Sequence, residues 1–288
     1  LFSCEAPKRL VVVGGGVIGL EMASYYQMTG TAVTVVEMMD HIAGPCDKDL
    51  VKLLQKNYER GGMRFELNAC VKVIGNSRVL CQRGGETFDL EADRVLVALG
   101  RRPNSQDLGL ESIGVLLENG AVRTDCHMRT NVPGIYAVGD INGKSMLAHT
   151  AYREAEVAVH TILGQKDTMS YRAIPSVLYT IPELSSVGLT EEEAKAQGLD
   201  VAVVRIPMAY SGRYVAENEN GDGIFKLVID KKLRTVVGAQ VLANYSSEFI
   251  AVVGIFIELA VPIDLIKKQV FPHPTVAEII REAACQFA

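Results

Sequence analysis

The spacing of apolar side chains along the first hundred residues switches repeatedly between two patterns. Short continuous runs rich in valine predict buried strands, and apolar side chains at intervals of three and four predict helices. The strands are expected at 10–13, 32–37, 63–66 and 95–99, and the helices at 17–28 and 47–60. Three more strand-like runs lie at 71–74, 79–82 and 87–90. Strands that alternate with helices in this way indicate βαβ units on a parallel sheet, here with a three-stranded meander beside it.

The pattern changes after the turn-rich stretch 100–106. Residues 107–165 contain a strand pattern at 135–138 and a helix pattern at 146–163, and this region is small for a domain of its own. The remainder is typical of an α+β domain, with a capping box at Thr190. Strands are expected there at 176–179, 185–188, 201–207, 224–229 and 235–242, and helices at 246–259 and 262–268. Length favours two domains, with a third partial one.

The composition is that of a globular protein, with 48% hydrophobic and 22% charged residues and a net charge of −5. The charges are interspersed, which argues against nucleic acid or an anionic membrane as a partner. The longest apolar run, 249–257, is broken by Gly254 and is too short to cross a bilayer. No signal peptide is visible, and the first residue is Leu1 rather than Met, so we expect material to precede this chain.

Six cysteines are scattered along the chain: Cys4, Cys46, Cys70, Cys81, Cys126 and Cys285. None lies close enough to another in sequence for a CxxC or CxxxxC redox pair. None has the neighbours that a zinc site needs, even at Cys126-His127. We therefore expect free thiols, no metal, and a reducing compartment, either the cytoplasm or the mitochondrial matrix.

A glycine-rich motif follows the first predicted strand. Gly14-Gly15-Gly16-Val17-Ile18-Gly19 has the form GxGxxG, and the second strand ends in Glu37, 18 residues past Gly19. In this context Gly14 allows a tight turn, Gly16 lets the backbone approach a pyrophosphate, and Gly19 lets the helix pack close to the strand. The motif predicts a dinucleotide site, and a glycine-rich turn without a ligand is the alternative.

Glu37 predicts which dinucleotide binds. Its carboxylate can accept hydrogen bonds from both hydroxyls of an adenosine ribose, and it would repel a 2′-phosphate. At about 4 Å and an effective dielectric near 20, that repulsion is on the order of 4 kcal/mol. The residues that follow, 38–40, include no arginine to bind such a phosphate. NAD is therefore favoured over NADP.

Near the end of the chain a histidine lies between two prolines, and a carboxylate follows it: Pro272-His273-Pro274 and then Glu278. Each proline fixes its own φ and restricts the residue before it, so the backbone around His273 is stiff. A carboxylate within reach could fix the tautomer of the imidazole and stabilise its charged form, as in a general base. Thr275 and Glu278 also fit a capping box for a helix from about 276 to 284. The residues alone leave both interpretations open.

Six stretches together resemble the flavoprotein disulfide reductases, and within them the dihydrolipoyl dehydrogenases. They are 14–21, 34–37, 99–104 (LGRRPN), 134–140 (GIYAVGD), 146–149 (MLAH) and 272–278. They follow the family's order over essentially the whole chain. The resemblance implies an α/β fold with a Rossmann-like NAD-binding domain and β-meander at 1–105, the C-terminal part of an FAD-binding domain at 106–168, and an α+β dimerisation domain at 169–288. It also implies a homodimer.

The same resemblance implies roles for individual residues. Glu21 would reach towards the nicotinamide, Glu37 would bind the adenosine ribose, Val71 would lie near the adenine, and Gly100 would contact NAD through its backbone. Asp140 matches the aspartate that binds the ribityl chain of FAD. The cofactor-binding residues are then Gly14, Gly15, Gly16, Val17, Ile18, Gly19, Leu20, Glu21, Glu37, Val71, Gly100, Asp140, Met146, Leu147, Ala148 and His149.

By resemblance, His273 and Glu278 are catalytic. The family's base lies in the active site of the partner subunit. His273 would therefore deprotonate a thiol of dihydrolipoamide, carried on a lipoyl domain, and Glu278 would orient the imidazole. Two positions depart from the family pattern: Phe271, where a histidine is frequent, and Pro272, where a small residue is frequent.

Two motifs of the family do not occur in this sequence: a first GxGxxG for FAD, and the CxxxxC redox disulfide. We therefore expect a fragment of dihydrolipoamide dehydrogenase that supplies the NAD site and the base, retains no FAD and is inactive alone. Two other functions stay open: another NADH-dependent flavoprotein disulfide reductase, or a non-catalytic NAD-binding dimerisation module.

Overall fold

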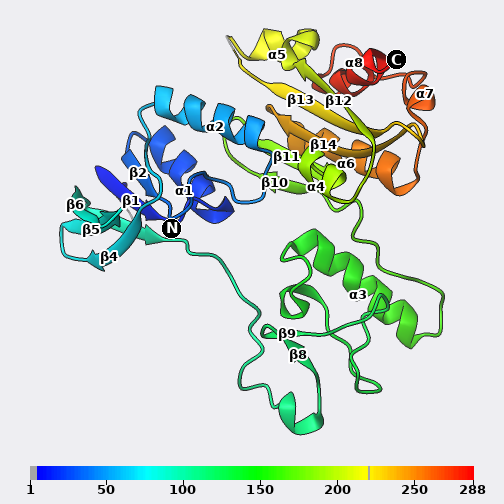
Figure 1. The fold of residues 1–288 in the computed structure, drawn as a ribbon, viewed down its shortest axis with the longest axis horizontal. Coiled ribbons are helices and arrows are strands. Elements are labelled where there is room, and N and C mark those ends of the chain that lie inside the picture. Colours follow the sequence, from blue (N-terminus) through cyan, green and yellow to red (C-terminus); the bar gives the residue numbers. More distant parts are fainter. Residues whose placement is uncertain (1–4, 220) are drawn as a thin grey trace. The chain divides into compact units, whose positions relative to one another are not determined.

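A parallel sheet with the strand order β3-β2-β1-β7 organises the first part of the chain (Figure 1). The structure, a computed structural model, describes residues 5–219 and 221–288, so Cys4 lies outside the described part. The strands are β1 (Arg9–Val13), β2 (Ala32–Val36), β3 (Arg64–Glu66) and β7 (Arg94–Val97), with helices α1 (Val17–Met28) and α2 (Lys48–Arg60) between them. The predicted alternation of strands and helices is confirmed.

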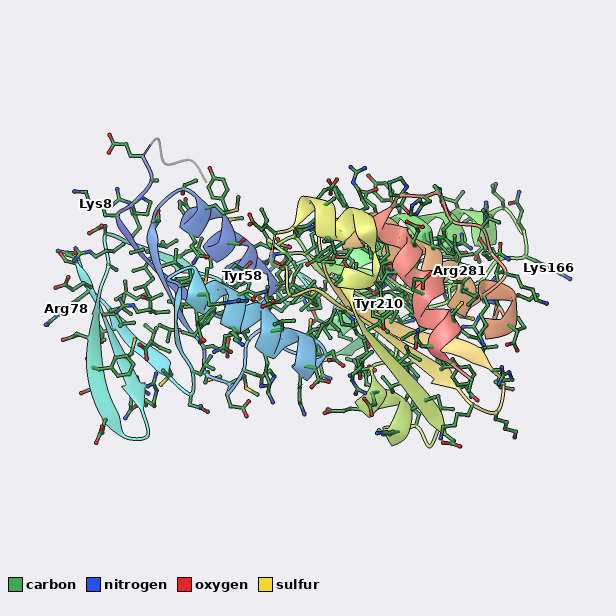
Figure 2. All side chains as sticks on the ribbon, turned by 90° about the horizontal axis from the view of Figure 1, so that it is seen from above. Lys8, Tyr58, Arg78, Lys166, Tyr210 and Arg281 are labelled. Atoms are coloured by element: carbon green, nitrogen blue, oxygen red, sulfur yellow. The ribbon has the colours of Figure 1, made fainter. Side chains whose placement is uncertain are left out.

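The three extra strands form an antiparallel meander with a sheet of its own. They are β4 (Cys70–Ile74), β5 (Arg78–Arg83) and β6 (Glu86–Glu91). Side chains such as Arg78 project from its outer face into solvent (Figure 2). These three strands confirm the strand pattern that was expected between 71 and 90.

The C-terminal segment is built on a five-stranded antiparallel sheet with the order β10-β11-β14-β13-β12. Its strands are β10 (Ser176–Leu178), β11 (Leu184–Gly188), β12 (Val201–Pro207), β13 (Ile224–Asp230) and β14 (Thr235–Leu242). Its helices are α4 (Glu191–Ala196), α5 (Gly212–Glu217), α6 (Ser246–Glu258), α7 (Ile263–Ile266) and α8 (Ile279–Gln286), with 3-10 turns η3 (Met208–Tyr210) and η4 (Val276–Glu278). The expected capping box is present at Thr190. The fold class is α/β with an α+β C-terminal part, as predicted.

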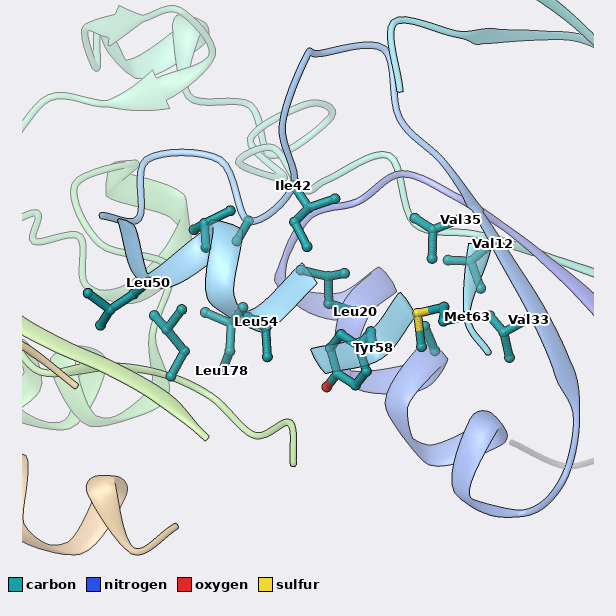
Figure 3. Close-up of a cluster of buried hydrophobic side chains, with 14 of the residues drawn as sticks. Val12, Leu20, Val33, Val35, Ile42, Leu50, Leu54, Tyr58, Met63 and Leu178 are labelled. Carbon is teal, nitrogen blue, oxygen red and sulfur yellow. The ribbon is translucent and has the colours of Figure 1, made fainter. Parts of the chain in front are cut away.

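The chain divides into two compact units, and the first contains the parallel sheet, the meander and the five-stranded antiparallel sheet. It takes in the chain up to Gly100 together with Pro175–Ala288, and the second is Arg101–Ile174. In the first unit, Leu178 packs beside Leu50 and Leu54 of α2, in one hydrophobic cluster (Figure 3). A fully buried leucine contributes about 1.5–3 kcal/mol to stability. The shared cluster therefore holds the parallel sheet and the antiparallel sheet together in one packed unit.

The second unit contains a two-stranded hairpin and one long helix. Its elements are η1 (Glu111–Ile113), β8 (Leu117–Glu118), β9 (Ala121–Val122), η2 (Gly139–Asn142) and α3 (Ala148–Ile162). The strand expected at 135–138 is wrong, because the structure has there an isolated bridge between Arg129 and Tyr136. The alternating pattern has another cause: Ile135 and Ala137 belong to one hydrophobic cluster, and Tyr136 and Val138 pack against another.

Candidate functional site

The turn after β1 can accept only glycine at two of its positions. Gly14 has a φ of +106°, and a Cβ there would lie 2.3 Å from the carbonyl oxygen of Ala98. A Cβ on Gly19 would lie 2.0 Å from the carbonyl oxygen of Gly14. Helix α1 therefore packs directly on the turn that precedes it, which is the close approach that a dinucleotide-binding loop requires.

Gly16 leaves the start of α1 open. It is the N-cap of the helix and provides no side-chain cap, and a Cβ built on it would meet no atom within 4 Å. The first turn carries no acidic residue, and the side chains of Val17 and Ile18 are exposed. The free N–H groups of this turn are therefore accessible to an anion such as a pyrophosphate.

Glu37 is held beside the glycine loop by backbone hydrogen bonds. Its Oε2 accepts from the N–H of Gly15 at 2.7 Å, and its Oε1 accepts from the N–H of Met39 at 2.8 Å. Each oxygen of a carboxylate can accept more than one hydrogen bond, so both can still accept from ribose hydroxyls. The sequence predicted the residue, and the structure adds the two contacts that orient it.

The other residues expected near NAD have more varied surroundings. Glu21 accepts a hydrogen bond from the backbone N–H of Tyr179 at 2.9 Å. Val71 lies on β4 opposite Cys81 and is half-buried, and Gly100 has a φ of +95° with an open backbone. The side chain of Leu20 is fully buried in the hydrophobic cluster, so only its backbone could contact a ligand.

Asp140, expected at the flavin, lies in the turn η2 of the second unit. Its side chain is 44% exposed, and its carboxylate lies 3.6 Å from Nε of Arg101. Met146 and Leu147 are half-buried just before α3, and Ala148 and His149 begin that helix with exposed side chains. The motif residues therefore follow one another along one segment that leads from η2 into α3.

Sequence reasoning missed Glu154, a fully buried carboxylate in α3. It accepts hydrogen bonds from the N–H of Gly139 at 2.6 Å, from the side chain of Asn142 at 2.9 Å and from the hydroxyl of Tyr171 at 2.5 Å. Burial, and then the carboxylate of Glu154, raise the pKa of Tyr171. The sequence did contain a signal for this residue. Glu154 lies on the same face of the helix as Val157 and Thr161, which are also buried.

His273 and Glu278 form the contact that the sequence suggested. Nδ1 of His273 lies 2.8 Å from Oε1 of Glu278, and the side chains are 79% and 22% exposed. Oε2 of Glu278 accepts from the N–H of Thr275 at 2.8 Å, as part of a capping box. The hydrogen bond from Thr275, and then that from His273, lower the pKa of Glu278. Glu278 therefore fits both the capping and the orienting interpretation.

An apolar pocket of about 300 Å³ is lined in part by the residues between His273 and Glu278 in the sequence. It is lined by Arg213, Tyr245, Glu248, Phe249, Pro274, Thr275, Val276 and Ala277. The pocket therefore includes the proline that follows His273, whereas His273 and Glu278 are not among its lining residues.

Other chemistry is sparse in the part of the chain that the structure describes. No group of three His, Cys, Asp or Glu side chains there could hold a metal ion, and no helix there is long and apolar enough to cross a membrane. The thiols of Cys46, Cys70, Cys81, Cys126 and Cys285 are free. Burial raises the pKa of Cys46 to about 11, which makes it a poor nucleophile.

Comparison with known families agrees with the fold. The profile described as pyridine nucleotide-disulphide oxidoreductase matches residues 1–155, and the profile of the dimerisation domain of the same family matches residues 174–284. The chain belongs to the pyridine nucleotide-disulphide oxidoreductase family.

Two relatives named dihydrolipoyl dehydrogenase match nearly the whole of this chain. The chain is 39% identical over 285 residues to the dihydrolipoyl dehydrogenase of Geobacillus stearothermophilus, and 38% identical over 286 residues to that of Bacillus subtilis. These matches cover 97% of this chain and 60% and 61% of the relatives, so the chain spans about three fifths of their length.

Solved structures also superimpose on nearly the whole of this chain. The HOCl-induced flavoprotein disulfide reductase RclA from Escherichia coli superimposes with a TM-score of 0.90 at 28% identity, over 100% of this chain and 66% of that one. LpdA from Mycobacterium tuberculosis gives a TM-score of 0.90 at 27% identity, over 99% and 62% of the two chains.

Proposed function

We propose that this chain supplies the NAD site and the histidine base of a dihydrolipoyl dehydrogenase, which oxidises dihydrolipoamide. The contact of 2.8 Å between Nδ1 of His273 and Glu278 carries this proposal, because a module that only bound nucleotide would not need an oriented base. The identity with dihydrolipoyl dehydrogenases supports it. The proposal includes the division into an NAD-binding part at 1–105, part of a flavin domain at 106–168 and a dimerisation part at 169–288.

The residues near the glycine loop fit NAD. The open start of α1 would bind the pyrophosphate, and Glu37 would accept hydrogen bonds from the adenosine ribose. Asp140, whose side chain is 44% exposed, would hold the ribityl chain of FAD. In such an enzyme the flavin supplies the transfer of electrons from a dithiol to NAD.

His273 would act as the general base. A carboxylate only accepts hydrogen bonds, so in the neutral imidazole the proton lies on Nδ1 and points at Glu278, which leaves Nε2 free to take a proton from a thiol. Glu278 would then stabilise the imidazolium that forms. General-base catalysis of this kind contributes roughly 10²–10⁴-fold to a rate.

A homodimer belongs to the same proposal. The dimerisation profile covers residues 174–284, and large apolar side chains in this segment remain exposed. Ile255, Leu259 and Val270 are 56%, 70% and 96% exposed. A second copy would cover these side chains. The His273 of each copy would then lie near the site of the other copy. Light scattering should give twice the mass of 31.3 kDa, and a clean monomer would count against this arrangement.

The proposal is tested on this chain by titration with NADH and by assay with dihydrolipoamide. We expect the chain to bind NADH, to show no flavin absorbance and to have no lipoamide turnover. Failure to bind NADH would overturn the NAD site. A yellow protein with turnover would overturn the idea that the chain is incomplete as a catalyst.

Another NADH-dependent flavoprotein disulfide reductase is the second candidate, favoured by the likeness to RclA from Escherichia coli over the whole chain. A longer form that carries a flavin separates the two: dihydrolipoamide activity supports the first, and activity on another disulfide alone supports the second. In that form, a His273→Gln change should slow dihydrolipoamide oxidation. Unchanged turnover would favour a third possibility, a non-catalytic NAD-binding module.

A further inference from the structure

Glu154 lies in the interior of the second unit, on the middle of α3, with 0% of its surface exposed. Burying a carboxylate costs several kcal/mol unless hydrogen bonds replace the lost water. Here all three partners donate: the backbone N–H of Gly139, the side-chain amide of Asn142 and the hydroxyl of Tyr171. The side chain is therefore kept in the core by its contacts to one turn and one tyrosine.

The two oxygens of Glu154 have separate tasks. Oε2 accepts from Gly139 at 2.6 Å and from Asn142 at 2.9 Å, which are the first and last residues of η2. Oε1 accepts from Tyr171 at 2.5 Å. Hydrogen bonds to a charged acceptor are roughly twice as strong as those between neutral groups. One carboxylate oxygen therefore fixes both ends of a four-residue turn, and the tyrosine fixes the carboxylate.

Asp140 lies inside this turn, next to Gly139. Its own backbone oxygen accepts from the N–H of Gly143 at 3.1 Å, and the Oδ1 of Asn142 accepts from the N–H of Lys144 at 2.9 Å. Gly139 and Gly143 have φ angles of +76° and +68°. Hydrogen bonds thus hold the turn at both ends, and between them the side chain of Asp140 is 44% exposed.

We propose that Glu154 is a positioning residue that fixes the turn of residues 139–142 and thereby sets where Asp140 presents its carboxylate to a ribityl hydroxyl. This inference rests on the proposed function, because that function makes Asp140 a flavin contact. Glu154 acts through Gly139 and Asn142 and does not touch the ligand.

The test is nuclear magnetic resonance of the full 288-residue chain, which needs no flavin. Glu154→Gln keeps the size of the side chain and removes its charge, and Tyr171→Phe removes the partner of Oε1 alone. Glu156→Gln is the matched control, since Glu156 lies two residues away on the same helix, is 63% exposed and pairs with Arg153. The readouts are the proton shift and hydrogen exchange of the Gly139 amide, and the shifts of Asp140.

A short bond to a carboxylate shifts an amide proton downfield and protects it from exchange. In Glu154→Gln the Gly139 proton should move upfield and exchange on the order of tenfold faster, and Asp140 should shift with it. Tyr171→Phe should give a smaller change of the same sign, and Glu156→Gln none. These readouts report the hydrogen bond to Gly139, which simple filling of space by residue 154 would not affect.

Unchanged Gly139 resonances in Glu154→Gln, or an equal change in Glu156→Gln, would overturn the proposal. If Glu154→Gln does not fold, Tyr171→Phe decides: faster exchange at Gly139 than in Glu156→Gln supports the role, and no difference rejects it. NADH binding is measured on the same samples. If the unmodified chain does not bind NADH, the proposed dehydrogenase function is refuted. That result would not affect the hydrogen bonds assigned to Glu154.

Discussion

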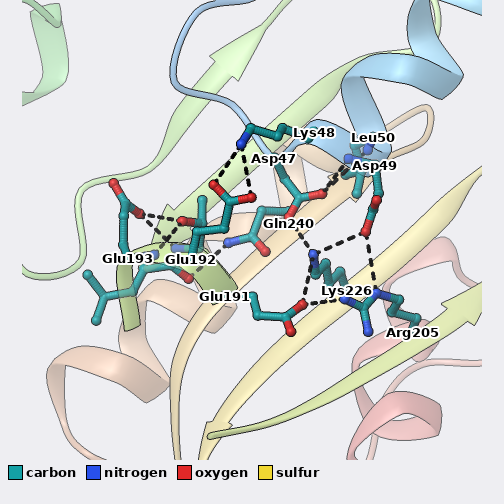
Figure 4. A network of polar contacts seen from close by, with 12 residues as sticks. Asp47, Lys48, Asp49, Leu50, Glu191, Glu192, Glu193, Arg205, Lys226 and Gln240 are labelled. Carbon is teal, nitrogen blue, oxygen red and sulfur yellow. Dashed lines mark hydrogen bonds and ion pairs between the residues drawn. The ribbon is translucent and has the colours of Figure 1, made fainter. Parts of the chain in front are cut away.

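Nζ of Lys226 on β13 lies 2.5 Å from Oδ2 of Asp47, the N-cap of α2, and the two side chains are 4% and 6% exposed (Figure 4). Asp47 also accepts hydrogen bonds from the N–H groups of Asp49 and Leu50, at 3.1 and 3.4 Å. The ion pair therefore connects the start of α2 to the antiparallel sheet of the C-terminal segment.

Lys226→Met should destabilise the protein strongly, because it leaves the carboxylate of Asp47 buried without its cation. We expect a loss of about 3–5 kcal/mol in the free energy of unfolding, measured in urea. Lys48→Met is the control: Lys48 pairs with Glu192 at the surface, and such pairs contribute about 0–1 kcal/mol. Adding Asp47→Asn to Lys226→Met should recover part of the loss, since asparagine still caps the helix. Equal losses in the two lysine variants would contradict the buried pair.

Sequence reasoning succeeded where the physical requirement is local. Gly14 and Gly19 are separated by five positions, and the need for glycine at both is visible in the motif. His273 and Glu278 are also five residues apart, so a contact between them could be foreseen. The meander and the alternation of strands with helices follow from periodicity for the same reason.

Contacts between distant segments could not be foreseen. Lys226 and Asp47 are 179 residues apart, and no pattern in the chain links them. The strand expected at 135–138 has the right alternation, but its side chains pack into two clusters without a partner strand. Leu20 was expected among the cofactor-binding residues, and its side chain is instead buried in the core.

The glycine loop offers a paired test of folding against binding. Gly16→Ala should cost at most about 1 kcal/mol of stability, because alanine is a poorer N-cap than glycine but its Cβ would meet no atom within 4 Å. It should nevertheless weaken NADH binding, since the methyl group occupies the approach of the pyrophosphate. Gly19→Ala should cost about 1–3 kcal/mol of stability, because its Cβ would overlap the oxygen of Gly14. Thermal unfolding and NADH fluorescence distinguish the two, and full NADH affinity in Gly16→Ala would refute the site.

Glu278 should make the free energy of unfolding depend on pH in the acid range. Its pKa in the folded chain is lowered from the ordinary 4.5, chiefly by the N–H of Thr275, so its charged form stabilises the fold above pH 4.5. That contribution is lost as the pH falls through the lowered pKa. The difference in unfolding free energy between the unmodified chain and Glu278→Gln should therefore shrink between pH 7 and pH 3. A difference that stays constant over this range would count against the hydrogen bonds assigned to the carboxylate.

The charge of Glu37 should make the chain prefer NADH to NADPH. A repulsion on the order of 4 kcal/mol exceeds the roughly 1.4 kcal/mol of a tenfold change in affinity, so a preference of at least about tenfold is expected in direct titrations. Glu37→Gln should raise the affinity for NADPH, because it removes the repulsion and keeps an amide oxygen for the N–H of Gly15. Glu86→Gln, at the exposed start of β6 in the meander, is the control and should change neither affinity. Equal binding of both nucleotides to the unmodified chain would show that the carboxylate does not face the 2′ position.

The neutral imidazole of His273 should exist as a single tautomer. Because the carboxylate of Glu278 accepts from Nδ1 at 2.8 Å, the neutral imidazole should carry its proton on Nδ1 and leave Nε2 bare. Long-range proton–nitrogen correlation at alkaline pH reports the tautomer directly. In Glu278→Ala the proton should shift to Nε2, while Glu282→Ala, an exposed carboxylate on α8, should leave it on Nδ1. A proton on Nε2 in the unmodified chain would mean that Glu278 does not orient the base. Nε2 would then have to lose its proton before it could accept one from a thiol.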